Sequence, residues 1–368
     1  MEKVRVGVVG CGAISGAYLG MAKNFPIVEI AAASDMDMAK ARAEEEKEDI
    51  ARECTVDELL ADPSIEIILN LTVPKAHVPV ALAAIDAGKH TYCEKPLGVD
   101  RAEGKRLLDA AQRANLRLGC APDTFMGAGI QTARKLIDDG AIGRPVAFTA
   151  FMMCPGHESW HPSPEFYYEV GGGPMFDMGP YYLTALLNLL GPAKRLTGAA
   201  SIAIPHRTIG SEPKRGKSIR VETPDHIVGT IEFADGALGT IVQSFATHFA
   251  TYDGKQPITV YGTEGTMKVP DPNGFDGPVH LRRKTDKDWI EMPQQFVSGY
   301  GRSVGLADMA HAIRSGRAHR ASGEQAFAVL DLMQGFLDSA SDGRAREPVS
   351  TYERPAPMPA HLPFGSLD

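Results

Sequence analysis

The chain has 368 residues, a formal net charge of −8 at pH 7, and 43% hydrophobic and 23% charged residues. This length favours two domains with real cores, and the acidic balance argues against nucleic acid or an anionic membrane as the main partner. Five scattered cysteines without C-x-x-C spacing, no bilayer-length apolar run and no signal peptide lead us to expect a cytoplasmic location.

The first third of the chain alternates between apolar and amphipathic segments. Five apolar segments are predicted to be strands: residues 4–9, 28–33, 65–71, 90–93 and 116–120. Five segments between them are predicted to be helices: residues 14–23, 38–48, 56–61, 74–87 and 101–114. Strands that are apolar throughout, each followed by a helix, indicate a parallel sheet covered on both faces. We therefore expect an α/β, doubly wound Rossmann domain over residues 1–122.

Residues 123–368 have a different pattern, in which most segments show period-two alternation. Strands are predicted at residues 146–152, 227–233, 237–245, 258–261, 266–269 and 279–282, and helices at residues 130–139, 174–190, 304–315 and 324–341. This pattern indicates an α+β domain with a large, mostly antiparallel open sheet. Residues 205–223 are expected to form a long loop, either a lid or an oligomer arm. The proline-rich tail from residue 355 is expected to be extended against the surface or disordered.

A glycine-rich loop follows the first predicted strand and opens a helix. Its sequence, Gly10-Cys11-Gly12-Ala13-Ile14-Ser15, matches G-x-G-x-x-G with serine at the third glycine. Gly10 makes the tight turn, Gly12 lets the backbone approach a pyrophosphate, and the amides of Ala13 and Ile14 face the phosphates. A bare match is common by chance, but its place at the end of the first strand favours dinucleotide binding.

Asp35 stands at the tip of the second predicted strand, about 20 residues beyond the loop, where an acid that binds the ribose is expected. A carboxylate there accepts hydrogen bonds from the ribose hydroxyls and repels a 2′-phosphate. Lys40 and Arg42, the nearest basic residues, lie on the following helix, so NAD is favoured over NADP. The alternative is that Asp35 only caps the helix that begins near Asp37.

Two further places carry side chains that suit catalysis. Lys95 follows the strand at residues 90–93, and ligands bind outside the carboxyl ends of parallel strands; the alternative is a solvated surface charge. Asp177 and Tyr181 are spaced i, i+4 on the predicted helix 174–190, so both side chains would leave one face. Because a nearby ammonium lowers the pKa of a phenol from about 10, the three residues are candidates for a proton relay. A first-turn acid and a half-buried packing tyrosine are the alternative.

The segment at residues 156–167 is polar and aromatic, as sugar-binding pockets are. We expect Trp160, His161 and Tyr167 to contact a substrate, with packing of the loop as the alternative for Trp160. The close spacing of His157 and His161 suggests a metal, but neighbouring prolines and the lack of a further acid–histidine pattern argue against one. No metal site is therefore expected.

Taken together, these motifs resemble the Gfo/Idh/MocA family, which includes glucose–fructose oxidoreductase and the inositol dehydrogenases. The resemblance rests on the loop at residues 10–15, Thr72-Val73-Pro74 with His77, Glu94-Lys95-Pro96, Asp177 with Gly179, and weaker matches at residues 136–143 and 261–265. It implies that Thr72, Pro74, His77, Glu94 and Lys95 belong to the cofactor site. It also implies a substrate between the two halves, beside Lys95 and Asp177, and a homodimer or homotetramer formed through the open face of the second sheet.

One departure from the family pattern concerns residue 181. Many members carry histidine four residues after the aspartate, whereas this chain has Tyr181. A minority that resemble glucose–fructose oxidoreductase and the dihydrodiol dehydrogenases carry tyrosine there, and it is taken to be their proton donor or acceptor. The resemblance therefore implies that role for Tyr181, with Lys95 as the rival.

These observations predict an NAD(H)-dependent oxidoreductase that acts on a CH–OH group of a sugar, glycoside or cyclic polyol. The substrate hydroxyl is expected between Lys95 and Tyr181, while Asp177 orients the sugar or holds the lysine. A redox-neutral glycoside hydrolase, lyase or epimerase that oxidises its sugar transiently would keep every motif. A nucleotide-sensing regulator would have no need of these three residues. The particular sugar, the carbon oxidised and the direction are left open by the sequence.

Overall fold

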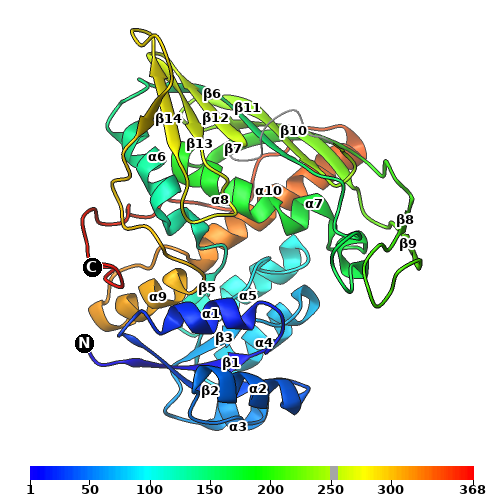
Figure 1. Cartoon of the computed structure of the whole chain (residues 1–368), viewed down its shortest axis with the longest axis vertical. Helices are drawn as coiled ribbons and strands as arrows, with labels where there is room; N and C mark the ends of the chain where they lie inside the picture. Colours follow the sequence, from blue (N-terminus) through cyan, green and yellow to red (C-terminus); the bar gives the residue numbers. More distant parts are fainter. Residues whose placement is uncertain (249–255) are drawn as a thin grey trace. The chain divides into compact units, whose positions relative to one another are not determined.

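A computed structural model describes residues 1–248 and 256–368 (Figure 1). The chain forms two compact units, one of residues 1–131, 295–330 and 355–368, and the other of residues 132–294 and 331–354. The sequence placed a single boundary at residue 122, whereas in the structure two later segments pack with the first unit. No helix among the described residues has both the length and the apolar character needed to cross a membrane.

A five-stranded parallel sheet forms the centre of the first unit, with strand order β2-β1-β3-β4-β5. Its strands are β1 (Val4–Val9), β2 (Val28–Ser34), β3 (Ile67–Asn70), β4 (His90–Cys93) and β5 (Leu118–Cys120). All four residues of β3 are buried, as expected of a central strand covered on both faces. The predicted parallel, doubly wound sheet is confirmed.

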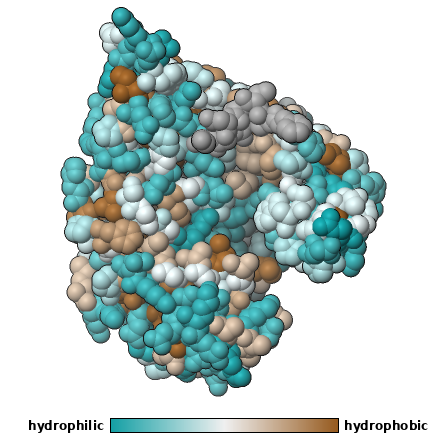
Figure 2. All heavy atoms as spheres, in the orientation of Figure 1, coloured by the Kyte–Doolittle hydropathy of each residue, from teal (hydrophilic) through white to brown (hydrophobic). Residues whose placement is uncertain are grey.

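The helices of this sheet are α1 (Ser15–Ala22), α2 (Met38–Glu48), α3 (Val56–Ala61), α4 (Pro74–Asp86) and α5 (Arg101–Arg113). Right-handed crossovers place α1 on one face and α4 and α5 on the other, because β2 lies on one side of β1 and β3 to β5 lie on the other side. Side chains cap three of the helices: Asp37 accepts from the amide of Ala39, Thr55 and Glu58 form a capping box, and Asp100 starts α5. The charged helix α2 presents a largely hydrophilic surface (Figure 2).

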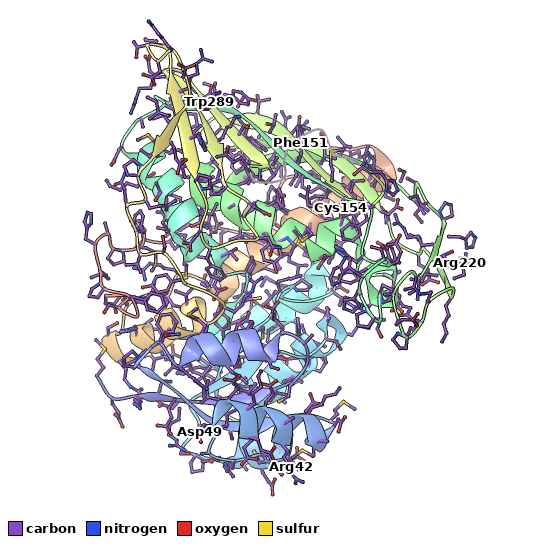
Figure 3. The ribbon with its side chains drawn as sticks, in the orientation of Figure 1. Arg42, Asp49, Phe151, Cys154, Arg220 and Trp289 are labelled. Carbon is purple, nitrogen blue, oxygen red and sulfur yellow. The ribbon has the colours of Figure 1, made fainter. Side chains whose placement is uncertain are left out.

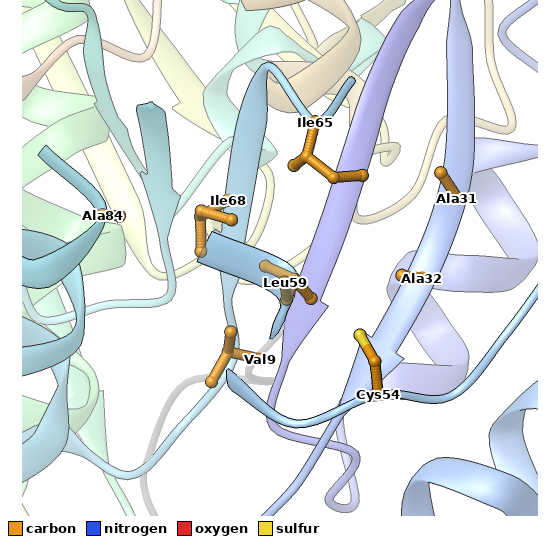
Figure 4. Packing of buried hydrophobic residues seen from close by; sticks show 8 residues of the cluster. All are labelled: Val9, Ala31, Ala32, Cys54, Leu59, Ile65, Ile68 and Ala84. Carbon is orange, nitrogen blue, oxygen red and sulfur yellow. The ribbon is translucent and has the colours of Figure 1, made fainter. Parts of the chain in front are cut away.

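An apolar cluster packs α3 against the sheet, and its members come from β1, β2, β3, α3, α4 and the segments beside them. They are Val9, Ala31, Ala32, Cys54, Leu59, Ile65, Ile68 and Ala84 (Figure 4). A Cβ on Gly7 would lie 2.8 Å from the side chain of Leu59, so glycine in β1 allows the helix to approach the strand closely. Full burial of a leucine such as Leu59 stabilises the fold by about 1.5–3 kcal/mol.

Later residues complete the first unit. Asp123 follows β5 and is fully buried, and its carboxylate accepts hydrogen bonds from the amides of Ser303 and Gly305 at 3.1 and 3.0 Å. These amides lie at the start of α9 (Val304–Ser315), which therefore depends on an acid far away in sequence. The tail at residues 355–368 has neither helix nor strand, yet Met358 and Leu367 are buried.

An eight-stranded sheet forms the second unit, in the order β15-β14-β13-β12-β6-β11-β10-β7. Its strands are β6 (Pro145–Met153), β7 (Ala193–Ser201), β10 (His226–Phe233), β11 (Leu238–Ser244), β12 (Ile258–Gly262), β13 (Gly265–Val269), β14 (Val279–Arg283) and β15 (Ile290–Met292). Among the strands described, β6 and β11 run parallel and the other neighbours antiparallel, so the mostly antiparallel sheet is confirmed. The edge strands β7 and β15 escaped prediction because they are short or largely polar.

Helices cover one face of this sheet. These helical segments are α6 (Ala128–Asp138), η2 (Glu165–Tyr168), α7 (Gly173–Asp177), α8 (Gly179–Leu190) and α10 (Gly323–Asp342). The short segment η1 (Thr124–Met126) belongs to the first unit. Phe336 of α10 lies against Gly198 of β7 and Gly229 of β10, where any Cβ would collide with it. Every residue of α8 is buried.

Two predictions about this unit were wrong. The predicted continuous helix at residues 174–190 is divided into α7 and α8 at Met178, because Pro180 has no N–H to donate and its ring clashes with the preceding turn. The predicted loop at residues 205–223 contains a two-stranded hairpin of β8 (His206–Thr208) and β9 (Ser218–Arg220). Its short polar strands carry too weak an alternation to be recognised in the sequence.

The buried acid at the start of α9 gives a testable pH dependence. Burial raises the pKa of Asp123 from 3.8 to about 6, against the lowering effect of Arg302. Because the folded state then holds the proton more tightly than the unfolded state, Asp123 makes stability fall as the pH rises from about 4 to about 6, by on the order of 2–3 kcal/mol. Asp123→Asn should lack this fall, so its unfolding temperature should lose less than that of the wild type across this range. A difference between the two proteins that is the same at every pH would contradict the assignment.

Candidate active site

The turn after β1 has the geometry of a phosphate cradle. Gly10 has φ +101°, which L side chains rarely adopt, and a Cβ there would lie 2.8 Å from the carbonyl group of Leu71. A Cβ on Gly12 would meet nothing within 4 Å, so the loop has open space at the position where a ligand phosphate approaches the backbone. Ser15 takes the third glycine position, fully buried, and its hydroxyl donates to the carbonyl of Gly12 at 2.6 Å. The residues of this loop therefore fit a dinucleotide.

Asp35 ties the end of β2 to this loop. Its Oδ2 accepts from the amide of Cys11 at 2.8 Å, and its Oδ1 accepts from the amide of Asp37 at 2.9 Å. The cap of α2 is Asp37 and not Asp35, which answers the alternative raised by the sequence. The guanidinium of Arg42 binds Glu53 at 2.6 Å. The carboxylate of Asp35 thus stands beside the cradle without an arginine directed to it, as suits NAD.

The thiol within the loop is not a nucleophile. Burial, together with the charge of Asp35, raises the pKa of Cys11 to about 12. The thiol therefore stays protonated at neutral pH, and only the thiolate is reactive.

The ends of β3 and β4 are joined by His77 of α4. This ring is fully buried, with Nε2 2.9 Å from the carbonyl oxygen of Thr72 and Nδ1 2.7 Å from that of Pro96. Burial lowers the pKa of His77. Pro74 opens α4 between these contacts. His77 therefore fixes the positions of Thr72 and Pro96 relative to each other.

Glu94 fixes the backbone of Lys95. Its carboxylate is 7% exposed and accepts from the hydroxyl of Tyr18 at 2.6 Å and from the amide of Lys95 at 2.8 Å. Burial raises the pKa of Tyr18 well above its usual value, so the phenol remains a donor. Glu94 therefore holds the main chain at the point just beyond β4 from which the Lys95 side chain extends.

The residues predicted to bind the cofactor thus follow the carboxyl ends of β1, β2, β3 and β4, which are neighbours in the sheet. They are Gly10, Gly12, Ala13, Ile14, Asp35, Thr72, Pro74, His77, Glu94 and Lys95. Since parallel strands end at a common edge, the fold brings them together there.

In the second unit, a buried ionic network anchors the segment that leaves β6 at Cys154 (Figure 3). Arg207 of β8, with 1% of its side chain exposed, donates to Glu158 and to the fully buried Asp225, both at 2.9 Å. The hydroxyl of Tyr168 donates to Glu158, and the guanidinium lies 4.8 Å from the centre of the Tyr168 ring. Removing one partner of such a buried network lowers the free energy of unfolding by about 3–5 kcal/mol, so the network holds the segment in place.

Aromatic rings gather on this segment around His157. The centre of its ring lies 4.5 Å from that of Tyr167, 4.6 Å from that of Phe245 and 5.2 Å from that of Trp160. His161 is in turn 5.4 Å from both Trp160 and Tyr167, ring centre to ring centre. The structure therefore brings the three residues predicted to contact a substrate into one cluster, in which Trp160 is 60% exposed.

The sequence did not predict the partner of Asp177. Nε2 of His157 lies 3.1 Å from Oδ2 of Asp177, and each side chain is 15% exposed. The neighbours of these residues in the sequence give no signal of this pairing, because it joins a loop to the end of α7. The spacing of His157 and His161 suggests only a metal ligand. Among the described residues, no group of three or more His, Cys, Asp or Glu side chains is placed to hold a metal ion.

Tyr181 is 5% exposed in the first turn of α8, and its amide donates to the carbonyl of Met178 at 3.1 Å. Because the helix is interrupted at Met178, the i, i+4 argument from the sequence does not place Tyr181 relative to Asp177. Both nevertheless flank the same helix break, which brings an acid and a phenol to one short stretch of the second unit.

Comparisons with known proteins give one match in each half of the chain. Residues 4–121 match the NAD-binding Rossmann fold of the GFO/IDH/MocA oxidoreductase family, and residues 130–268 match the C-terminal domain of that family. A 1,5-anhydro-D-fructose reductase of Ensifer adhaerens is 30% identical over 58% of this chain and 59% of its own length. A levoglucosan dehydrogenase of Pseudarthrobacter phenanthrenivorans is 26% identical over 73% of each chain. A solved levoglucosan dehydrogenase, in complex with NADH and L-sorbose, shares the fold with a TM-score of 0.81 at 21% identity, over 95% of this chain and 100% of that one.

Three glycine-to-alanine variants distinguish a role in the turn from a role in ligand binding. Gly10→Ala should lower both thermal stability and NADH affinity, because its Cβ collides with the backbone. Gly12→Ala should leave stability unchanged and weaken NADH binding at least about 10-fold, because its Cβ enters the space for the pyrophosphate. Gly20→Ala, in the open interior of α1, should bind NADH normally and gain up to about 1 kcal/mol. Calorimetric titration with NADH and thermal melts measure all three, and normal binding by Gly12→Ala would refute the cradle.

Proposed function

This chain belongs to the Gfo/Idh/MocA family of NAD-binding oxidoreductases, and we propose that it transfers a hydride between NAD and a CH–OH carbon of a sugar, glycoside or cyclic polyol. The observation that carries the proposal is the placement of Lys95 directly beyond β4, with its backbone held by the buried Glu94, on the edge that also bears the NAD loop. The relatives named above, a reductase and a dehydrogenase of anhydrosugars, support the substrate class.

The proposed chemistry divides the work between the two units. NAD, when bound, supplies the hydride acceptor at its nicotinamide ring. Tyr181 takes the proton of the substrate hydroxyl, and the ammonium of Lys95 steadies the developing alkoxide. Asp177 orients the substrate, and the cluster of Trp160, His161 and Tyr167 offers ring faces and polar edges to a sugar.

The location expected from the sequence enters here as a proposal. All five cysteines are free thiols, four of them buried. Free thiols suit a reducing compartment, where NAD is also supplied, so we propose a cytoplasmic enzyme.

The direct test is net NADH formation with a panel of myo-inositol, levoglucosan, glucose and methyl glucosides, and NADH consumption with 1,5-anhydro-D-fructose. With a reactive member of the panel, Lys95→Met and Tyr181→Phe should each lower the rate of hydride transfer by about 10²- to 10⁴-fold in stopped-flow absorbance. The reason is that either variant loses a group that handles the developing negative charge.

Matched controls are Lys105→Met, on the surface of α5, and Tyr182→Phe, the neighbour of Tyr181; both should react like the wild type. Near-normal hydride transfer in both Lys95→Met and Tyr181→Phe would remove these residues from the chemistry. The absence of NADH change across the panel in the wild type would reject the proposed reaction itself.

We further propose that the chain is a homodimer or homotetramer that associates through the sheet face opposite α10. In the central strand β6, Phe148, Ala150 and Met152 are buried, whereas Phe151 belongs to the alternate set that is only half-buried (Figure 3). An apolar ring at the middle of a wide sheet face is typical of an interface between copies.

Phe151→Glu should therefore reduce the molecular mass measured by sedimentation equilibrium, because a charge in the centre of the interface cannot be solvated there. Its circular dichroism should match that of the wild type. Lys105→Glu, an exposed charge reversal on α5, should leave the mass unchanged. A monomeric wild type, or an unchanged mass for Phe151→Glu, would contradict the proposed interface.

A further inference from the structure

The hydroxyl of Tyr18 lies behind the main chain of Lys95. Tyr18 belongs to α1, the helix that follows the glycine-rich loop, and its side chain is fully buried. Its hydroxyl donates to Oε1 of Glu94 at 2.6 Å, and Oε2 of the same carboxylate accepts from the amide of Lys95 at 2.8 Å. One carboxylate thus connects the phenol of α1 to the main chain just beyond β4.

The two hydrogen bonds fix the orientation of the Glu94 carboxylate. The last torsion of a glutamate side chain has little preference of its own, so neighbours decide its value. A hydroxyl that donates to a carboxylate makes a charge-assisted bond, about twice as strong as a neutral one, and 2.6 Å is a usual length for it. Burial, together with the charge of Glu94, raises the pKa of Tyr18 well above its usual value, so the phenol stays a donor. Without this donor the carboxylate is free to turn away from the Lys95 amide.

The main chain of Tyr18 is held as well. Its carbonyl oxygen accepts from the hydroxyl of Ser303 at 2.9 Å. Ser303 has φ +90°, a conformation that persists only where the surroundings impose it. Asp123 supplies that constraint, because its carboxylate accepts from the amides of Ser303 and Gly305. Tyr18 is therefore fixed at both ends, by the start of α9 at its carbonyl and by Glu94 at its hydroxyl.

Tyr92 provides a comparison within the same unit. It lies in β4 and is fully buried, as Tyr18 is. Within residues 1–248 and 256–368, the hydroxyl of Tyr92 has no hydrogen-bond partner. The unit thus accommodates one buried tyrosine whose hydroxyl is unpaired among these residues. The hydroxyl of Tyr18 is instead directed to the carboxylate that holds Lys95.

We propose that Tyr18 is a positioning residue for Lys95 and acts through the carboxylate of Glu94. This inference rests on the proposed function, in which the Lys95 ammonium has to meet the developing alkoxide. The hydroxyl of Tyr18 keeps Glu94 on the Lys95 amide, and the amide sets the point from which the lysine side chain extends. The role requires no contact of Tyr18 with substrate or NAD.

Amide hydrogen exchange tests the positioning in the free protein. The full chain is labelled with 15N-lysine, and the amide signals of Lys95 and Lys89 are assigned by their loss in Lys95→Met and Lys89→Met. In Tyr18→Phe, the amide of Lys95 should exchange at least about 10-fold faster than in the wild type, because its acceptor is no longer held. The amide of Lys89, which donates to the carbonyl of Ala84 at 2.9 Å, should exchange at the wild-type rate and reports that the fold is intact.

Two further variants show whether Tyr18 acts through Glu94. Tyr92→Phe removes another buried hydroxyl and should leave the exchange of the Lys95 amide unchanged. Glu94→Met removes the acceptor, so the Lys95 amide should exchange fast in it, and adding Tyr18→Phe should change the rate by less than about 2-fold. An unchanged Lys95 rate in Tyr18→Phe, or the same acceleration by Tyr18→Phe in the wild type and in Glu94→Met, would overturn the inference.

Kinetics then relate the positioning to the reaction. With a substrate that reacts, Tyr18→Phe should lower single-turnover hydride transfer at saturating NAD by about 10- to 100-fold, the range expected when a reacting group is misplaced by about 1 Å. The affinity for NADH in calorimetric titration should stay within about 3-fold of the wild type, because the glycine turn that faces the pyrophosphate is unchanged. Tyr92→Phe should match the wild type in both measurements.

The outcomes separate this inference from the proposed function. Failure of the wild type to transfer a hydride with any member of the panel would reject the proposed function, and hydrogen exchange would still decide whether Tyr18 holds Lys95. Hydride transfer at the wild-type rate in Tyr18→Phe, or a loss that higher NAD concentrations restore, would overturn the positioning role while the proposed function stands.

Discussion

Parallel strands end at a common edge, and the whole cofactor half of this protein depends on that constraint. The turns after four neighbouring strands bring a glycine with positive φ, a carboxylate, a threonine and a lysine to one edge of the sheet. Each turn is then locked to its neighbour by a side chain, Asp35 between β1 and β2 and His77 between β3 and β4. These contacts are made by the chain's own residues, so ligand binding need not create them.

In the second unit, the candidate residues lie on loops and on an interrupted helix, and not at the ends of strands. There the buried Arg207, which binds both Glu158 and Asp225, holds the segment in place, as hydrogen bonds between strands hold the turns in the first unit. Such a network adds little net stability compared with an apolar core, but it admits one arrangement of the segment it holds. The aromatic cluster and the pair of His157 with Asp177 both depend on that arrangement.

The sequence predicted the features that have a local signal. Apolar strands, the glycine turn and the acid after β2 were visible because period, spacing and residue type act over short distances, and the Rossmann sheet followed from them. Pro180 is also a local signal, because a proline there interrupts the helix. The contact of His157 with Asp177, the anchoring by Arg207 and the return of residues 295–330 to the first unit had no local signal, because each joins segments far apart in the chain. The roles of Lys95, Asp177 and Tyr181 are still predictions.

The interleaving of the two units has a consequence for biosynthesis. Ser303 and Gly305 satisfy the buried carboxylate of Asp123, and Tyr300 packs against Phe25 with ring centres 5.8 Å apart. A nascent chain that has emerged only as far as residue 131 therefore exposes an unsatisfied acid and bare aromatic surface. The segment that completes the amino-terminal sheet is therefore made only after residues 132–294 of the second unit have been translated.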